Sequence, residues 1–158
     1  SYLPITRYAL QQSDGVTAIS KFMKQATIET FDFDEIEVIP NFICPKFYQA
    51  VENSPLRAEL APAGERLLVH VSNFRPVKRP LDCVEILAKT RAAGADVKLV
   101  MVGDGPERAA AHHRARQLGV LERTVFVGKQ PKIADYLAAA DVFLLPSEQE
   151  SFGLAALE

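Results

Sequence analysis

From residue 67 onward, short runs of apolar residues alternate with longer amphipathic segments. The runs are rich in valine and leucine and carry few polar residues, which is typical of strands covered on both faces. Strands connected by helices in this way predict an α/β fold around a parallel sheet. The expected strands are 67–71, 97–102, 124–127 and 142–145, and the expected helices are 80–93, 106–118 and 132–140.

Proline and glycine mark the expected ends of these helices. Pro80 and Pro106 are predicted in the first helical turn, where a missing N–H group costs nothing. Gly94 and Gly119 are predicted to end two helices, because glycine readily adopts the left-handed conformation that closes a helix.

The first forty residues have their own pattern, with a helix over 4–12, a strand over 15–19, a helix over 20–31 and a strand over 36–39. Pro40 and Asn41 then break it. The segment 41–64 contains prolines at positions 45, 55 and 62 and has room for one short helix after Ser54. We interpret this segment as a connector between two α/β units.

Composition and charge exclude several classes of protein. The 158 residues include 18 Lys and Arg and 20 Asp and Glu, which gives a net charge of −2, and 48% are hydrophobic. That apolar fraction excludes intrinsic disorder, and the absence of a dense Lys and Arg cluster disfavours nucleic-acid binding. The apolar run 137–146 is interrupted by Asp141 and is shorter than the ~20 residues of a membrane-spanning helix.

The cysteines indicate a redox environment, and the chain ends indicate whether the sequence is a fragment. Cys44 and Cys83 cannot form a disulfide framework and lack metal-binding spacing, so we expect a reducing, cytoplasmic environment. The chain begins without Met, and its last residues read as a helix without a stop signal. We therefore expect a fragment of a longer protein.

The strongest local signal for a site is the passage 144–154, at the carboxyl end of the last expected strand. Ligands of open parallel sheets bind in the crevice outside these strand ends. The expected helix starts with Ser151, Phe152, Gly153 and Leu154, whose unpaired N–H groups would form an anion site.

Two carboxylates accompany this passage. Glu150 and Glu158 would lie about 12 Å apart along the axis if both were helical, so they could reach the two ends of an elongated ligand. The alternative is that Glu150 only favours a helix N-terminus and Glu158 is a solvated surface acid.

The loop after the strand 67–71 is the second candidate. Arg75, Lys78 and Arg79 place three cations within five residues, which could hold a diphosphate, although a solvated loop is an equal alternative. The third candidate, Gly103-Asp104-Gly105, has the first half of a dinucleotide fingerprint but no third glycine. We interpret it mainly as a tight turn that leads into a helix begun by Pro106.

Two other features favour ordinary surface roles. Asp32 and Asp34 have the spacing with which transferases hold a metal against a diphosphate, but they lie in an acidic stretch before a strand, which favours a solvated turn. His112 and His113 are adjacent on an expected helix and cannot share a metal as an i, i+4 pair would. Walker loops and Gly-x-Ser-x-Gly elbows do not occur in the sequence.

Taken together, four segments resemble the retaining glycosyltransferases of family 4. They are 71–79, 102–106, 126–130 and 150–158, in the order and spacing of that family. The resemblance covers essentially the whole chain and implies the arrangement called GT-B, in which two Rossmann-like domains face each other across a cleft. It implies that 1–41 is the end of an N-terminal acceptor domain and 42–158 the first part of a C-terminal nucleotide-sugar-binding domain.

The resemblance also implies roles for individual residues. The E-x7-E motif falls on Glu150, which would approach the transferred sugar, and Glu158, which would bind the ribose. Lys78 matches the phosphate-binding lysine, while Asn73 replaces the usual arginine, for which Arg75 is the candidate substitute. The remaining implied contacts are the helix-start segment Ser151, Phe152, Gly153 and Leu154 for the diphosphate, Gly128, Lys129 and Gln130 for uracil, and Arg7 for an anionic acceptor. An equal alternative for Arg7 is a surface arginine that covers apolar area.

The implied reaction is transfer of a sugar, with retention, from a UDP-sugar to a small hydroxylated acceptor. The residues of 72–79, 128–130 and 147–154 are most similar to those of the family members that catalyse the first step of bacillithiol synthesis. This resemblance implies N-acetylglucosamine as the sugar and L-malate as the acceptor. Lys78, Arg75 and the helix amides would neutralise the leaving diphosphate, so no metal or other cofactor is expected. Alternatives are another acceptor (a lipid or polysaccharide), a GT-B sugar-nucleotide epimerase and a non-catalytic nucleotide-binding module. We expect the fragment alone to be inactive.

Overall fold

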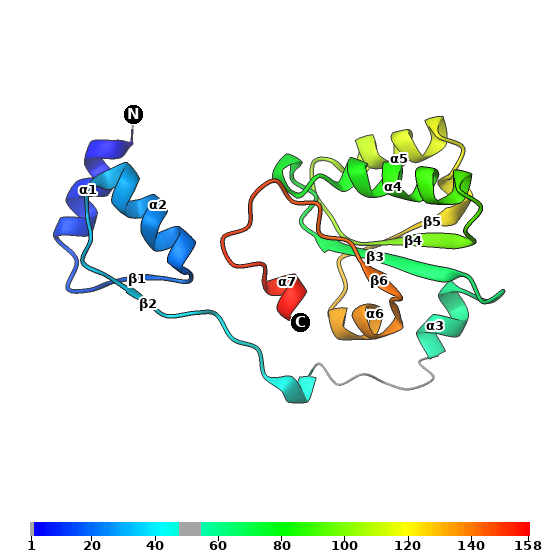
Figure 1. The fold of residues 1–158 in the computed structure, drawn as a ribbon, viewed down its shortest axis with the longest axis horizontal. Coiled ribbons are helices and arrows are strands. Elements are labelled where there is room, and N and C mark those ends of the chain that lie inside the picture. Colours follow the sequence, from blue (N-terminus) through cyan, green and yellow to red (C-terminus); the bar gives the residue numbers. More distant parts are fainter. Residues whose placement is uncertain (1, 48–54) are drawn as a thin grey trace. The chain divides into compact units, whose positions relative to one another are not determined.

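The computed structural model describes residues 2–47 and 55–158, which form two compact units (Figure 1). The first unit runs to Ile43 and includes 150–154, and the second comprises 44–149 and 155–158. Each unit is built around its own parallel sheet. The assignment of 1–41 to an acceptor domain and of 42–158 to a nucleotide-sugar domain stays a prediction.

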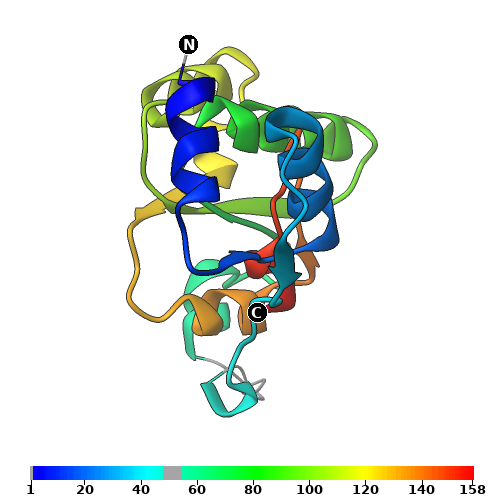
Figure 2. The same ribbon diagram turned by 90° about the vertical axis from the view of Figure 1, so that its left-hand side faces the viewer.

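The first unit contains two helices and two strands in the predicted order. The elements are α1 (Leu3–Gln11), β1 (Val16–Ala18), α2 (Lys21–Phe31) and β2 (Ile36–Val38), and the strands pair in parallel. The helices lie side by side (Figure 2). Ser20 caps α2, because its hydroxyl accepts a hydrogen bond from the Met23 amide at 3.1 Å.

The second unit is a four-stranded parallel sheet with helices on both faces. The strand order is β5-β4-β3-β6, so the chain runs from β3 to β4 and β5 and then crosses back to the other side of β3. All four predicted strands are present, although β6 is shorter than expected. The strands are β3 (Arg66–Ser72), β4 (Val97–Gly103), β5 (Thr124–Gly128) and β6 (Val142–Phe143).

Helices cover the two faces of this sheet and enclose two apolar cores (Figure 1). One core lies under α4 (Pro80–Ala92) and α5 (Arg108–Gln117), around Leu87 and Leu99. The other lies under α3 (Pro55–Leu60) and α6 (Ile133–Ala139), around Val69 and Val100. Because both faces are covered, most residues of these strands are apolar, as their sequence predicts. The remaining elements are the 3₁₀ turns η1 (Pro45–Phe47), η2 (Pro76–Lys78) and η3 (Leu121–Arg123), and helix α7 (Leu154–Leu157).

Most of the predicted helix ends are confirmed. Pro80 is the first residue of α4, and Gly94 follows its last turn with φ +91°. The amides of Gly94 and Ala95 donate to carbonyls of that turn, which satisfies groups that would otherwise lack partners. Pro106 is the exception: it lies two residues before α5, in the turn that leads to it, so it does not begin the helix.

Two carboxylates near the amino ends of the strands hold ionic networks together. Glu65, 5% exposed, accepts a hydrogen bond from Lys98 at 2.9 Å and another from the Ala63 amide at 3.0 Å. The hydrogen bond from Lys98 is the main reason why the pKa of Glu65 is lowered from 4.5 to about 2. This ion pair links the start of β3 to β4.

Asp141 has a similar role just before β6. Its carboxylate accepts hydrogen bonds from the Leu67 amide at 2.8 Å, from Arg57 at 2.8 Å and from Arg66 at 2.7 Å. Burial disfavours the ionised form, but these hydrogen bonds outweigh it, and the pKa of Asp141 falls from 3.8 to about 2. Asp141 therefore ties α3 and β3 to the start of β6.

The two cysteines occupy contrasting environments. Cys83 is fully buried in the core under α4, and burial raises the pKa of its thiol to about 12. Cys44 is exposed and its sulfur is not bonded to that of Cys83. Within 2–47 and 55–158, no helix combines the length and the apolar character needed to cross a bilayer.

Candidate functional site

The strand order of the second unit places a topological switch point between β3 and β6. From β3 the chain continues to β4 and β5 on one side, and then crosses back to β6 on the other side of β3. Such a switch point is where open parallel sheets bind ligands. The sequence predicts a candidate site after each of these strands.

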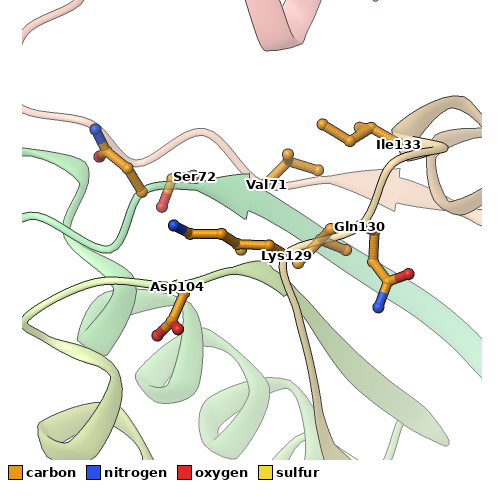
Figure 3. Close-up of a pocket in the computed structure, with 9 residues that line it drawn as sticks. Val71, Ser72, Asp104, Lys129, Gln130 and Ile133 are labelled. Carbon is orange, nitrogen blue, oxygen red and sulfur yellow. The ribbon is translucent and has the colours of Figure 1, made fainter.

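A cavity of about 220 Å³ opens beside this point, across the carboxyl ends of β3, β4 and β5 (Figure 3). Its apolar lining comes from three aliphatic side chains, Val71, Val102 and Ile133. The other lining residues are Ser72, Asn73, Gly103, Asp104, Lys129 and Gln130. The structure thus brings together Asn73, Lys129 and Gln130, which the sequence assigned to one ligand from separate loops.

An irregularity in β5 sets the direction of the Lys129 loop. The pairing with β4 shifts, so that Met101 faces Phe126 but Val102 faces Gly128. Such a bulge re-aims the following residues. Gly128 has φ +71°, and Lys129 extends across the cavity toward the end of β3 at Ser72 (Figure 3).

Gln130 is held by its own loop. Its side-chain amide donates to the Val127 carbonyl at 2.7 Å. That hydrogen bond fixes the side chain at the rim of the cavity, on the side away from Ser72 (Figure 3).

Two glycines allow the loops after β3 and β4 to lie against each other. A Cβ atom on Gly103 would lie 1.8 Å from the Ser72 carbonyl oxygen, and one on Gly105 would lie 1.9 Å from that of Asn73. The Glu107 amide then donates to the Phe74 carbonyl at 3.0 Å, which joins the two loops. The pair of glycines thus serves close backbone packing, beyond the tight turn that the sequence predicts.

Asp104 places a carboxylate at the same cavity. Its Oδ1 accepts the Gly105 amide at 2.8 Å and lies 3.7 Å from an Arg108 nitrogen. Together with Lys129, the cavity therefore presents one cation and one anion.

The three cations after β3 have different surroundings. Arg79 forms an ion pair with Asp82 of the following helix, so its charge is already partly neutralised. Arg75 is exposed and Lys78 is half-buried, both at η2. The Glu148 amide donates to the Val77 carbonyl at 2.9 Å, which places η2 next to the segment that follows β6. Lys78 and Arg75 thus lie at η2, next to the segment that follows β6 and outside the cavity lining.

The predicted helix start at Ser151 is wrong. The helix α7 begins only at Leu154 and has four residues, and Gly153 has φ +80°, which is incompatible with a right-handed helix. Glu150, Ser151 and Phe152 lie outside any helix, so the helical spacing calculated between Glu150 and Glu158 does not apply. Diphosphate binding by the amides of Phe152, Gly153 and Leu154 stays a prediction from the resemblance alone.

Arg7 lies on α1 of the first unit, where its guanidinium donates to the Asp32 carboxylate at 3.0 Å. Asp32 ends α2 in the left-handed conformation, so one acid of the D-x-D pair has a structural role. Within the described part of the chain, no three His, Cys, Asp or Glu side chains are grouped so that they could hold a metal.

Sequence reasoning missed several residues near the cavity. Ser72 and Asp104 were noticed only as parts of motifs, and Ile133 as part of a helix. His70 was not singled out, although a histidine inside an apolar strand is a signal that a polar partner must be buried beside it. His70 and Ser72 are hydrogen-bonded to each other, with 2.8 Å between the ring Nε2 and the hydroxyl oxygen.

Comparison with known proteins agrees with this architecture. Residues 54–158 match the family described as glycosyl transferases group 1. N-acetyl-alpha-D-glucosaminyl L-malate synthase of Bacillus anthracis is 39% identical over 98% of this chain and 41% of its own length. 2-Deoxystreptamine glucosyltransferase of Streptomyces kanamyceticus is 29% identical over 98% of this chain and 42% of its own length. The chain therefore spans about two fifths of these relatives.

A solved structure gives the same result for the fold. Anabaena Alr3699/HepE, in complex with UDP and glucose, superposes with a TM-score of 0.88 and 25% identity, over 97% of this chain and 44% of its own. The predicted fold, α/β with Rossmann-like parallel sheets from a two-domain GT-B architecture, is confirmed. With the family match across the second unit and relatives along nearly all of its length, the chain belongs to the glycosyl transferases group 1.

Proposed function

We propose that the protein containing this chain is a retaining glycosyltransferase of family 4 that takes its sugar from a UDP-sugar. The observation that carries the proposal is the cavity at the carboxyl ends of β3, β4 and β5, in a chain of the group 1 family. Its volume of about 220 Å³ is below that of pockets for whole drug-sized ligands, so it suits one ring-bearing part of a nucleotide. The complex of Alr3699/HepE with UDP and glucose supports a uridine nucleotide.

The proposed arrangement places the nucleotide across the loops after the strands. Lys129 and Gln130 contact the base, and the apolar lining of Val71, Val102 and Ile133 packs against it. The diphosphate extends toward η2, where Lys78 and Arg75 supply positive charge. Asn73, at the edge of the cavity toward η2, donates an amide at the position for which the family resemblance implies an arginine.

The proposed chemistry is front-face transfer. The acceptor hydroxyl attacks the anomeric carbon from the side that the diphosphate leaves, and the leaving phosphate takes the acceptor proton. Negative charge grows on that phosphate in the transition state, so preorganised cations lower the barrier. Glu150 and Glu158 keep the roles that the family resemblance gives them, at the transferred sugar and the ribose.

This chemistry needs no metal ion, because Lys78 and Arg75 neutralise the leaving group. Activity of the full-length protein is therefore expected to be unchanged in excess chelator. A loss that only added Mg²⁺ or Mn²⁺ restored would show that a cation belongs to the mechanism.

The proposed acceptor is L-malate, with N-acetylglucosamine as the sugar. The relative from Bacillus anthracis supports it by its identity along the chain, while the relative from Streptomyces kanamyceticus shows that acceptors differ within the family. Malate carries two carboxylates, and the planar Arg7 guanidinium could bind one through two parallel hydrogen bonds. In the structure, that guanidinium is paired with the Asp32 carboxylate at 3.0 Å.

The donor half is tested with Lys78→Ala in the full-length protein. We expect kcat/KM for the UDP-sugar to fall by about 100-fold, the usual effect of removing one charge partner of a transition state. Arg116→Ala, which removes an exposed cation from α5, is the matched control and should leave the rate unchanged. If Lys78→Ala lowered kcat/KM by less than threefold, Lys78 would be interpreted as a residue of a solvated loop without a role in catalysis.

The acceptor half is tested by product analysis with malate and a panel of other hydroxylated acceptors. Arg7→Ala should raise KM for malate and leave KM for the donor unchanged, whereas Asp32→Asn should affect KM for malate far less. Identical malate kinetics in Arg7→Ala would make Arg7 a surface residue. UDP binding without any sugar transfer would instead indicate a nucleotide-binding module.

A further inference from the structure

His70 is completely buried in the middle of β3, yet both of its ring nitrogens have polar partners. Nδ1 lies 2.9 Å from the Leu144 carbonyl oxygen, and Nε2 lies 2.8 Å from the Ser72 hydroxyl. A carbonyl can only accept, so Nδ1 carries the proton and donates. In the neutral ring, Nε2 then accepts from the Ser72 hydroxyl.

The Ser72 hydroxyl passes this link on to Phe74. Its oxygen accepts a hydrogen bond from the Phe74 amide at 3.1 Å. Phe74 has φ +41°, which an L residue with a large side chain rarely adopts and which persists only where the surroundings hold it. The Phe74 ring is fully buried and stacks on the His70 ring, with 6.1 Å between the ring centroids and 18° between the planes.

This network links the carboxyl end of β3 to the segment that follows β6. The backbone ladder between these strands is short, and its last hydrogen bond runs from the Leu144 amide to the Val69 carbonyl at 2.8 Å. Beyond that hydrogen bond, the His70 side chain connects the two segments once more, through its contact with the Leu144 carbonyl. On its other side, Ser72 and the next residue, Asn73, line the cavity.

We propose that His70 is a positioning residue for the nucleotide: through the Ser72 hydroxyl it fixes the turn at Phe74, and so the place of Asn73 at the cavity. The inference rests on the proposed function and adds to it a residue that does not touch the ligand. Because His70 is fully buried, its Nε2 relies on the Ser72 hydroxyl as its hydrogen-bond partner. The same hydroxyl oxygen accepts the Phe74 amide, and these two hydrogen bonds hold the loop in place.

Two substitutions separate the two hydrogen bonds of His70. His70→Asn keeps a donor at the position of Nδ1, toward Leu144, and loses the acceptor for Ser72. His70→Gln places an amide oxygen near the position of Nε2, toward Ser72, and loses the donor for Leu144. Leu99→Ala is the control, because it empties part of the same apolar core without touching the network.

The experiment measures UDP affinity by calorimetry and the amide hydrogen exchange of the nucleotide-free full-length protein. In His70→Asn we expect UDP to bind about tenfold more weakly, the effect of one lost buried hydrogen bond. The Phe74 amide should exchange faster by a similar factor. His70→Gln should stay within threefold of wild type in both measurements, and Leu99→Ala should lower thermal stability while UDP affinity is retained.

Three results would overturn the inference: unchanged exchange of the Phe74 amide in His70→Asn, unchanged UDP affinity in that variant, or equal loss of affinity in all three variants. A wild-type protein that bound neither UDP nor a UDP-sugar would overturn the proposed function. If the wild type bound UDP and His70→Asn bound it equally tightly, only the role of His70 would be overturned.

Discussion

Replacing Gly105 by alanine should disrupt the contact between the loops after β3 and β4. The added Cβ would lie 1.9 Å from the Asn73 carbonyl oxygen, 2.8 Å from the Asn73 carbonyl carbon and 3.2 Å from that of Phe74. All three atoms belong to backbone, so no side chain can turn away to make room. One loop must move by about 1.5 Å to restore an ordinary contact distance.

The expected cost has two parts. Overpacking of a tight contact costs about 2 kcal/mol, and the displaced loop loses the hydrogen bond from the Glu107 amide to the Phe74 carbonyl, which adds about 1 kcal/mol. We therefore expect Gly105→Ala to lower the free energy of unfolding by about 3 kcal/mol. UDP affinity should fall as well, because Asn73 and Asp104 line the cavity from the two displaced loops.

Two other glycines calibrate this measurement. Gly94 has open space around it but φ +91°, so Gly94→Ala should cost only the backbone strain, about 1 kcal/mol. Gly15 has open space and no positive φ, so Gly15→Ala should stay within about 0.5 kcal/mol of wild type. Urea unfolding of the full-length protein, followed by circular dichroism, gives the three values. If Gly105→Ala were no less stable than Gly94→Ala, the close approach of the loops would be refuted.

Two further predictions concern titratable groups. Glu65 and Asp141 have pKa values of about 2 in the folded protein, against ordinary values of 4.5 and 3.8. Their ionised forms therefore stabilise the fold fully above the ordinary values, and this stabilisation is lost as the pH falls toward 2. Urea unfolding between pH 6 and pH 2.5 should show the loss of stability, and Lys98→Met should make that loss smaller. Because burial raises the pKa of the Cys83 thiol to about 12, iodoacetamide should modify the exposed Cys44 and leave Cys83 unmodified until the protein unfolds, as peptide mass spectrometry can establish. Native modification of Cys83 at the rate of Cys44, or a stability that did not change in acid, would contradict these environments.

The sequence was sufficient to predict the elements of the second unit, because strands buried on both faces are mostly apolar and glycine closes the helices before β4 and β5. It was not sufficient for the strand order. On that side of β3, the start of β6 is held by Asp141, whose carboxylate pairs with Arg57 and Arg66, both distant from it along the chain. Spacing along a sequence carries no information about such a meeting point.

The site was predicted in part, for a related reason. Lys129, Gln130 and Asn73 belong to loops after parallel strands, and the carboxyl ends of such strands meet at one edge. The helix expected from Ser151 failed because Gly153, taken as an ordinary first-turn residue, adopts a positive φ. His70 was overlooked because its partners are a backbone carbonyl 74 residues away and the hydroxyl of Ser72.

The position of β6 also determines the order in which this unit assembles. Leu68 pairs with Val142, far along the chain, whereas Arg66 pairs with Val97 and Leu99 with Thr124, so β6 closes the longest loop. Closing a longer loop costs more conformational entropy, and β6 gains only two residue pairs with β3 to offset this cost. We therefore expect β3, β4 and β5 to form the folding transition state and β6 to dock after it. The contact between β3 and β6 is then the last to form and the first to open, so a ligand that bridges the loops after these two strands acts mainly by slowing unfolding and changes the folding rate little.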